Sequence, residues 1–232
     1  MRSLRPLFAP VAAREFKRRA SRVATVDEVL NLAYTFESFG ITIRPCQSRW
    51  EFRRLLEEVS RLRPRAMLEI GTANGGTLMA LARVCAPDAM VISVDLPRGA
   101  FGGGYPLWKL PLYKAFARGN QRLDLIRGDS HSSATFEDVR ARLSGQMLDF
   151  LFIDGDHTYQ GVKQDFDCYR ELVRPGGLIA FHDIAPAHAG SAAVDDPGDV
   201  PRFWAELMHQ REAREFVQPN GCGCFGIGLV SG

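Results

Sequence analysis

The sequence predicts an α/β fold in which helices cover both faces of a seven-stranded, mostly parallel sheet that closes with a C-terminal antiparallel hairpin. Three observations predict this fold. An apolar strand over residues 67–70 runs into a glycine-rich turn that opens a helix. Strand and helix patterns then alternate along the chain, which indicates parallel strands joined by crossover helices. Two final strand patterns are separated by a short turn, which is typical of a hairpin.

Two helices are expected before the glycine-rich turn. Thr25 with Glu28, and Ser48 with Glu51, match the capping box, in which two side chains satisfy free N–H groups at a helix start. After the turn, periodicity predicts helices at about 75–85, 133–143, 159–173 and 200–212, and strands at about 90–94, 123–127, 149–153, 177–181, 214–218 and 224–230. The turn between the last two strands is Pro219-Asn220-Gly221.

Two stretches follow strand ends and match no regular pattern. They cover residues 98–119 and 185–200. Ligands of open α/β sheets bind beyond the carboxyl ends of the strands, so long loops there are candidates for a lid or a substrate wall. The alternative is that both are surface insertions.

The composition fits one globular domain, with 232 residues of which 46% are hydrophobic and 24% charged. Residues 1–25 carry seven basic residues and one acidic residue, a net +6, which leaves −4 for the rest because the total is +2. This distribution argues against a nucleic-acid-binding surface on the body of the protein. The N-terminus is then a basic arm or helix that is either solvated or in contact with a membrane surface or another anionic partner.

Five cysteines, an odd number, are scattered along the chain, and the sequence shows no apolar leader and no long apolar span. This usage predicts a soluble, cytoplasmic protein without a transmembrane segment. Cys222 and Cys224 are separated by one residue. They form either a metal or redox pair, or small residues packed near the last strand.

The glycine-rich turn comprises Gly71, Thr72, Ala73, Asn74, Gly75 and Gly76. Glycines let the backbone approach a bound group closely, and the free N–H groups of the first helical turn face that group. Ala73 stands where the dinucleotide-binding pattern would place its second glycine. The turn therefore predicts a ligand site without fixing the ligand.

Two acids follow the next strands. Asp95 lies 24 positions after Gly71 and ends its strand, where a carboxylate can accept hydrogen bonds from both ribose hydroxyls. Asp129, with Ser130, follows the third strand, where it could accept from an adenine amino group. For both acids the alternative is a cap on the next helix.

A further group of polar residues follows the fourth and fifth strands. Asp154, Asp156 and His157 share one turn, and Asp183 ends the next strand. Adjacent parallel strands bring these ends together, so Asp154 and Asp183 could hold one Mg²⁺, Mn²⁺ or Ca²⁺ ion. His157 or Asp156 could then act as a general base, or cap the helix that begins near Thr158.

These motifs, in this order, resemble those of class I S-adenosylmethionine-dependent methyltransferases. The chain is most similar to metal-dependent O-methyltransferases that modify sugars and other small molecules in macrolide and aminocoumarin biosynthesis, and to related proteins named cephalosporin hydroxylases. The resemblance covers about residues 45–185. It implies a three-layer, Rossmann-like methyltransferase domain over residues 46–232, with a basic N-terminal arm and helical extension over residues 1–45.

The resemblance implies S-adenosylmethionine as cofactor and a divalent cation, Mg²⁺ or Mn²⁺. The implied cofactor-binding residues are Glu69, Gly71, Thr72, Asn74, Gly75 and Gly76 for the methionine part, Asp95 for ribose, Asp129 and Ser130 for adenine, and Asp154. The implied metal ligands are Asp154, His182 and Asp183. His182 replaces a carboxylate of the family pattern, so it binds metal, contacts substrate or is a strand-end histidine. The base carries over to His157 or to Asp156.

The resulting hypothesis is O-methylation of a small-molecule hydroxyl, in which the cation orients the acceptor, His157 or Asp156 takes its proton, and the oxygen attacks the sulfonium methyl. The acceptor would be a sugar or another natural-product-like molecule. A homo-oligomer is common among similar proteins. The alternatives are an NAD-dependent oxidoreductase, a metal-dependent hydroxylase, and a non-catalytic domain that binds the nucleoside as a partner.

Overall fold

The computed structural model describes residues 4–101, 103–186, 198–219 and 226–232. Its strands are β1 (Glu37–Ser38), β2 (Ile41–Thr42), β3 (Ala66–Ile70), β4 (Met90–Asp95), β5 (Arg122–Arg127), β6 (Leu148–Ile153), β7 (Val173–His182), β8 (Ala213–Phe216) and β9 (Ile227–Ser231). Its α-helices are α1 (Arg5–Ala20), α2 (Val26–Thr35), α3 (Arg49–Leu62), α4 (Gly76–Val84), α5 (Leu110–Lys114), α6 (Ser133–Leu143), α7 (Tyr159–Tyr169) and α8 (Val200–Met208). Two 3-10 turns, η1 (Leu107–Lys109) and η2 (Arg170–Leu172), join them.

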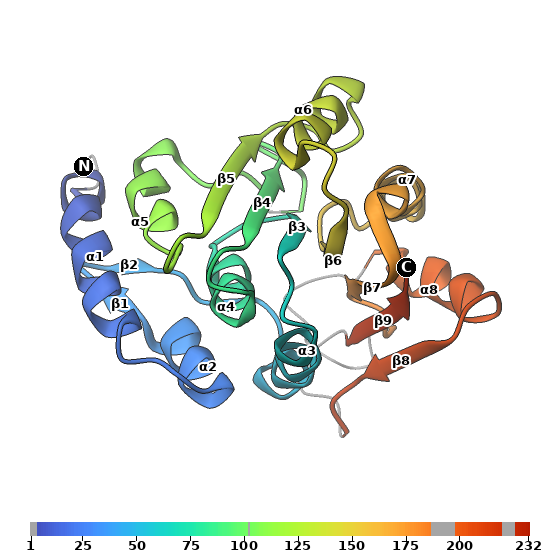
Figure 1. Ribbon diagram of the computed structural model, residues 1–232, viewed down its shortest axis with the longest axis horizontal. Coiled ribbons are helices and arrows are strands. Elements are labelled where there is room, and N and C mark those ends of the chain that lie inside the picture. Colours follow the sequence, from blue (N-terminus) through green and yellow to red (C-terminus); the bar gives the residue numbers. More distant parts are fainter. Residues whose placement is uncertain (1–3, 102, 187–197, 220–225) are drawn as a thin grey trace.

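The main sheet has seven strands in the order β5-β4-β3-β6-β7-β9-β8 (Figure 1). The five strands from β5 to β7 are parallel, whereas β9 pairs antiparallel with both β7 and β8. The predicted fold class, including the terminal hairpin, is confirmed. The predicted turn at residues 220–221 and the cysteine pair Cys222 and Cys224 lie outside the described residues.

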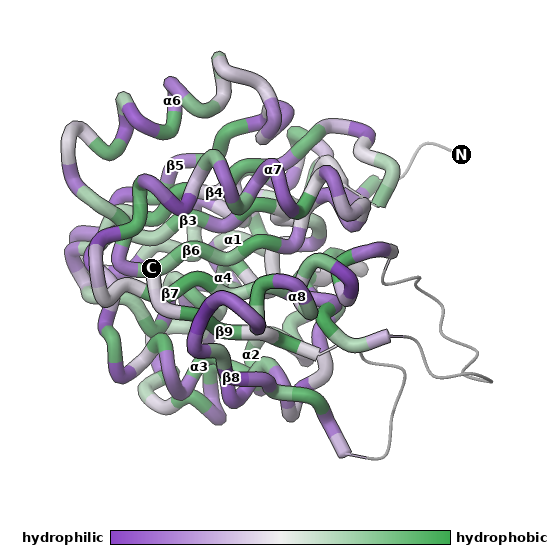
Figure 2. Tube along the Cα trace, turned by 90° about the vertical axis from the view of Figure 1, so that its right-hand side faces the viewer, coloured by the Kyte–Doolittle hydropathy of each residue, from purple (hydrophilic) through white to green (hydrophobic). Residues whose placement is uncertain are grey.

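Helices cover both faces of the sheet and make three layers (Figure 1). Alternate residues of each strand point to opposite faces. Met67 and Val91 join an apolar cluster with α1 to α5, whereas Leu68 and Ile92 join a cluster with α6, α7 and α8. Figure 2 shows apolar residues concentrated on the central strands and more hydrophilic residues on the outer helices. The sheet is therefore the middle of the core.

The register of the parallel strands determines which residues lie at the carboxyl edge of the sheet. Ile70 of β3 pairs with Val94 of β4 and with Ile153 of β6, and Ile153 pairs in turn with Phe181 of β7. Because these strands are parallel and in step, the residues that follow them emerge at one edge of the sheet. This edge carries the site described below.

The basic N-terminal segment is a helix, α1, which packs against α5 and α2. Phe16 of α1 is fully buried, and its ring meets those of Phe36 and Phe116 at centroid distances of 5.5 and 5.0 Å. The apolar face of α1 thus joins the core on one side of the sheet. The division of the chain at residue 45 stays a prediction.

The two predicted helix starts differ. Thr25 and Glu28 form the complete capping box of α2. Ser48 caps α3 by accepting from the Glu51 N–H, but the Glu51 carboxylate does not return to Ser48. Its Oε1 accepts instead from the backbone N–H of Gln218 at 2.9 Å, so this predicted box is only half formed.

Other differences from the predicted elements have local causes. The helix predicted to reach residue 173 ends at Tyr169, because β7 already begins at Val173. The strand β7 continues through Pro175, which has no N–H to donate, and its pairing with β6 shifts register there. The stretch 98–119 contains η1 and α5. Residues 187–197 of the second long loop lie outside the described residues. Within the described ranges, no helix is both long and apolar enough to cross a bilayer.

Candidate active site

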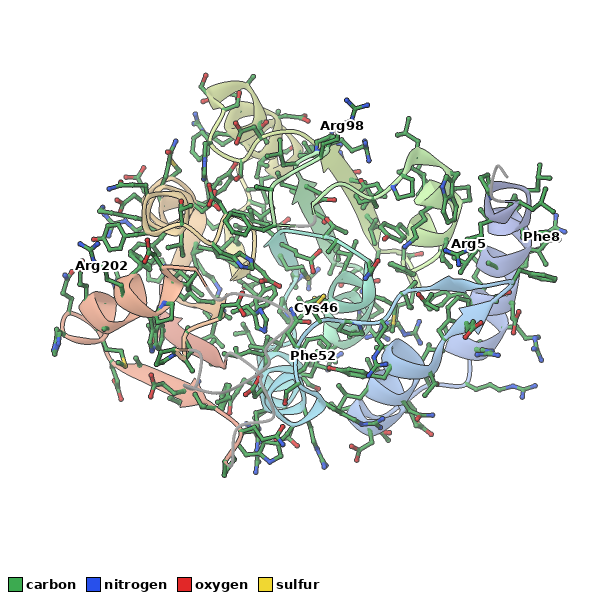
Figure 3. All side chains as sticks on the ribbon, turned by 180° about the vertical axis from the view of Figure 1, so that it is seen from behind. Arg5, Phe8, Cys46, Phe52, Arg98 and Arg202 are labelled. Carbon is green, nitrogen blue, oxygen red and sulfur yellow. The ribbon has the colours of Figure 1, made fainter. Side chains whose placement is uncertain are left out.

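A cavity of about 240 Å³ lies at the carboxyl edge of the parallel strands. Residues that follow β3, β4, β5 and β6 form its walls, including Gly71, Asp95, Gly128 and Asp154. Residues 99–101 of the loop after β4 also line it. Arg98 marks the start of this loop at the outer edge of the molecule (Figure 3). The position is the one at which open α/β sheets bind ligands.

Close backbone contacts explain the glycines of the turn. Gly71 has φ +95°, and a Cβ there would lie 1.9 Å from the backbone oxygen of Asp154. At Gly76 a Cβ would lie 1.9 Å from the backbone oxygen of Ile43. Thr72 and Gly76 are buried, and Gly71 and Ala73 line the main cavity. Asn74, Gly75 and Gly76 line a narrower cavity of about 20 Å³ beside it.

Asp95 lies in the wall of the main cavity, as the sequence predicts for a ribose-binding acid. Its Oδ2 accepts from the backbone N–H groups of Gly104 and Tyr105, at 3.0 and 3.1 Å. Burial raises the pKa of the Asp95 carboxyl, and these backbone hydrogen bonds oppose the rise. The loop after β4 is thereby fixed to the strand end, beside the space that a nucleoside would occupy.

Asp129 and Ser130 also line the main cavity. Oδ1 of Asp129 accepts from the backbone N–H of His131 at 2.9 Å, which closes a turn before α6. The hydroxyl of Tyr169 donates to the carbonyl of Ser130 at 2.9 Å. The adenine contacts predicted for Asp129 and Ser130 stay predictions, as does the ribose contact of Asp95.

Glu69 lies beneath the cavity and not in its wall. It is fully buried, and the hydroxyl of Ser93 donates to its Oε2 at 3.1 Å. Ser93 in turn makes a short contact with the hydroxyl of Thr72. Burial raises the pKa of Glu69 well above its usual range, and the nearby charges of Asp154 and Asp95 raise it further. The cofactor contact expected of Glu69 stays a prediction, whereas Glu69 supports Thr72 through the hydroxyl of Ser93.

Asp154, His182 and Asp183 come together at the cavity edge. One ligand atom from each lies within 4.8 Å of the others. His182 Nδ1 is 3.1 Å from Asp154 Oδ1 and 3.0 Å from Asp183 Oδ1. Burial lowers the pKa of His182, but the two carboxylates outweigh it and hold this pKa well above the usual value. The sequence placed all three residues in one site, and the structure brings them together.

The cluster fits a divalent cation. Asp183 Oδ1 is buried and makes no well-formed hydrogen bond in the protein, although His182 Nδ1 lies 3.0 Å away, so this oxygen keeps lone pairs that a cation would satisfy. Two carboxylates and one imidazole are a donor set that Mn²⁺, Fe²⁺ or Zn²⁺ accepts, and Mg²⁺ accepts less readily. Asp183 also has φ +62°, an unusual conformation for a non-glycine residue.

The two candidate bases are engaged differently. Asp156 Oδ1 accepts from the backbone N–H of Thr158 at 2.8 Å, so it forms the turn that leads into α7. His157 Nδ1 lies 3.1 Å from Asp183 Oδ2, and its ring stacks on Phe101 with 4.7 Å between centroids. The N-cap of α7 is Thr158, so Asp156 holds the turn before the helix and does not itself cap it. Asp156 also lines the main cavity.

Gln47 is a site residue that the sequence analysis missed. Its Nε2 donates to Asp154 Oδ2 at 2.7 Å, and its Oε1 accepts from the Thr77 hydroxyl at 2.9 Å. Only 4% of Gln47 is exposed. Its neighbour Cys46 lies near the middle of the molecule (Figure 3). The adjacent Ser48 marked a helix start, but no pattern connected Gln47 to a residue 107 positions away.

Comparison with known proteins identifies the family. Residues 68–184 match the family described as "Methyltransferase domain", which is half of the chain. The caffeoyl-CoA O-methyltransferase of Stellaria longipes is 28% identical over 144 residues, covering 61% of this chain and 54% of that protein. The demethylmacrocin O-methyltransferase of Streptomyces fradiae is 27% identical over 108 residues, covering 42% of this chain and 27% of that protein.

Solved structures share the fold. The O-methyltransferase TomG from Streptomyces achromogenes, in complex with SAM, superposes with a TM-score of 0.59 at 19% identity, covering 91% of this chain and 92% of that one. The chain spans between 17% and 66% of the length of the curated relatives that it matches.

The chain belongs to the methyltransferase domain family. The resemblance to class I S-adenosylmethionine-dependent methyltransferases is therefore confirmed, and with it the expected fold and class of cofactor. Family membership favours methyl transfer over the NAD-dependent oxidoreductase alternative.

Proposed function

We propose that this protein is an S-adenosylmethionine-dependent O-methyltransferase that acts on a hydroxyl group of a small molecule, assisted by a divalent cation. The observation that carries the proposal is the meeting of two features at one edge of the sheet. A cavity with an acid at the ribose position adjoins a buried cluster of two carboxylates and an imidazole. The family assignment supports methyl transfer at this edge.

The cofactor would occupy the main cavity. Gly71 lines this cavity, and its lack of a side chain lets the ends of β3 and β6 approach closely there. Asp95 is placed to accept hydrogen bonds from ribose hydroxyls. Asp129 and Ser130 line the part of the cavity assigned to adenine. S-adenosylmethionine supplies an electrophilic methyl group when it is bound.

Asp154, His182 and Asp183 would hold the cation, which makes a coordinated hydroxyl more acidic. Gln47 donates to Asp154 Oδ2 and so orients this carboxylate. His182 and Asp183 are buried, which strengthens the electrostatic interactions at this end of the cluster.

His157 is the better candidate for the general base. If its Nδ1–H donates to Asp183 Oδ2, at 3.1 Å, the ring is held in one tautomer and Nε2 remains to accept the proton of the acceptor hydroxyl. Phe101 packs on the imidazole face and restricts its rotation. Asp156 is held in the turn before α7 and is less free to move a proton.

The acceptor proposed is a sugar or another natural-product-like molecule. The relatives named demethylmacrocin O-methyltransferase and caffeoyl-CoA O-methyltransferase support a small-molecule acceptor. We also propose a cytoplasmic location, supported by the free thiols of Cys46, Cys85 and Cys168, and a homo-oligomer, supported by the resemblance alone.

Turnover tests this proposal. Purified protein is incubated with S-adenosylmethionine, Mn²⁺ or Mg²⁺ and a panel of hydroxylated sugars, phenols and macrolides, and S-adenosylhomocysteine release is measured. On an accepted substrate, Asp154→Asn and His157→Gln are expected to lower kcat by about 100-fold or more. Asp167→Asn and His209→Gln, outside the site, serve as matched controls.

The outcomes separate the parts of the proposal. Turnover that survives both site substitutions would disprove the proposed mechanism. Turnover that requires iron and oxygen and transfers no methyl group would establish the hydroxylase alternative.

A further inference from the structure

A second polar cavity lies at the opposite edge of the sheet, where the parallel strands begin. Its volume is about 190 Å³. It is bounded by the turn between α1 and α2 and by the ends of α3 and α4. These four helices lie on one side of the sheet in Figure 1. Three arginines line it: Arg63 after α3, Arg83 in the last turn of α4, and Arg118 before β5. None of its lining residues is acidic.

Arg83 and Arg118 also line a neighbouring cavity, together with Lys17 of α1. Arg83 and Arg118 therefore line both cavities. Arg63 adds a third basic side chain to the first cavity, and Lys17 adds one to the second. No acidic residue lines the neighbouring cavity either. Within the described ranges, none of these four basic residues takes part in an ion pair.

Helix capping accounts for only part of this arrangement. Arg83 Nη2 donates to the carbonyls of Ala20 and Val23, at 2.7 and 3.4 Å, and Arg118 Nη2 donates to the carbonyl of Cys85 at 2.7 Å. Both contacts satisfy carbonyls at helix ends. Arg118 Nε, however, is buried and has no hydrogen-bond partner in the protein. A buried donor without an acceptor is costly unless a ligand satisfies it.

Positive charge around Arg83 and Arg118 is also not compensated by an ion pair among the described residues. Burial lowers the pKa of Arg83, and the nearby charge of Arg118 lowers it further. Glu28, in the first turn of α2, accepts with its carboxylate from the backbone N–H groups of Ala24 and Thr25. An anion between the arginines would relieve both the like-charge repulsion and the unmet donor.

We propose that this cavity, the arginine pocket lined by Arg63, Arg83 and Arg118, binds the phosphate group of a small soluble molecule. Planar guanidinium groups match tetrahedral phosphate oxygens through paired hydrogen bonds. A cavity of about 190 Å³ favours inorganic phosphate or a small phosphate ester over an extended surface. The site is separate from the cofactor cavity, and the proposal is independent of the methyltransferase assignment.

Titration calorimetry tests the proposal with inorganic phosphate and pyrophosphate as probes, at ionic strength held constant with chloride. Saturating S-adenosylhomocysteine is added in a parallel series, so that the cofactor cavity is filled. The expected result is one saturable site with a millimolar or tighter Kd that is unchanged by the nucleoside. Binding that is lost when S-adenosylhomocysteine is present would place the anion in the cofactor cavity and overturn the proposal.

Three variants locate the site. Arg118→Gln and Arg83→Gln remove the positive charge but keep a polar side chain, and they are expected to weaken pyrophosphate binding about tenfold or more. Arg140→Gln, on the exposed face of α6 beside Glu137, is the matched control and should change the Kd by less than about twofold. Wild-type affinity in both pocket variants, or no saturable binding to the wild type, would overturn the proposal.

Two further measurements complete the test. If the Arg83 or Arg118 variant fails to fold, as judged by circular dichroism, Arg63→Gln takes its place because that side chain is exposed. About threefold weaker binding is then expected. Flotation with phosphatidylglycerol vesicles, with phosphatidylcholine vesicles as reference, separates the two sources of phosphate. Vesicle binding without pyrophosphate binding would mean a lipid surface and would overturn the soluble ligand.

Discussion

Replacement of Gly71 by alanine tests how closely the backbone must pack beneath the cofactor cavity. The added Cβ would lie 1.9 Å from the Asp154 oxygen, whereas real contacts of this kind are no shorter than 3.0 Å. The backbone must therefore move by about 1 Å. This movement disturbs two hydrogen bonds of 2.9 Å, from the Gly71 N–H to the Val94 carbonyl and from the Asp154 N–H to the Ile70 carbonyl.

Gly145 offers a matched control. It has φ +85°, close to the +95° of Gly71, but its Cβ would meet nothing within 4 Å. Gly145→Ala should therefore cost only the left-handed conformation, about 1–2 kcal/mol. Gly71→Ala adds the lost hydrogen bonds, at about 1 kcal/mol each, for a total of about 4 kcal/mol.

Thermal unfolding measures the difference. For a chain of this length, about 1 kcal/mol corresponds to about 2–4 °C in Tm, so the expected decreases are about 4 °C for Gly145→Ala and about 12 °C for Gly71→Ala. Gly71→Ala should also weaken S-adenosylhomocysteine binding, because it displaces the cavity wall. Equal Tm values for the two variants would refute the close-packing argument.

Two further predictions follow from the polar contacts. Gln47→Leu keeps the side-chain volume but removes the donor to Asp154, so the affinity for Mn²⁺, measured by calorimetry, should fall about 10-fold or more. The control Gln146→Leu should leave this affinity unchanged. Equal Mn²⁺ affinities in the two variants would show that Gln47 does not support the cation site. The buried carboxylate of Asp165, 3.3 Å from His131 Nε2, raises the pKa of His131 to about 9. Because the folded state then holds this proton more tightly than the unfolded chain, the associated stability is present below about pH 6.5 and is lost as the pH rises through about 9. The free energy of unfolding, measured with denaturant, should decrease by about 1–2 kcal/mol between pH 7 and 10, and this decrease should be smaller in His131→Gln. Identical pH profiles for the two proteins would contradict this role of His131.

Local motifs and sheet topology explain what the sequence could predict. The turn at Gly71, the strand-end acid Asp95 and the group formed by Asp154, His182 and Asp183 each follow a recognisable apolar strand. Parallel pairing then places all of them at one edge, as the register between Ile70, Val94 and Ile153 confirms. Their proximity depends on parallel pairing, which the alternation along the chain indicates, and on the order of the strands, which only the structure gives.

Contacts that depend on side-chain packing between distant segments could not be predicted. Gln47 reaches Asp154 over 107 positions, and Glu51 leaves its expected capping partner for Gln218, which is 167 positions away. Neither contact leaves a periodic trace in the sequence. The same holds for Phe101, which lies in a loop flagged only for its length but stacks on His157.

Calorimetry of S-adenosylhomocysteine binding to wild-type protein and to Asp95→Ala tests the central claim most directly. The claim is that the cavity at the carboxyl edge of the strands holds the nucleoside, with Asp95 at the ribose. The expected result is saturable binding to the wild type and affinity about 10-fold or more lower in Asp95→Ala. Absence of binding to the folded wild type, or equal affinity in the variant, would contradict it.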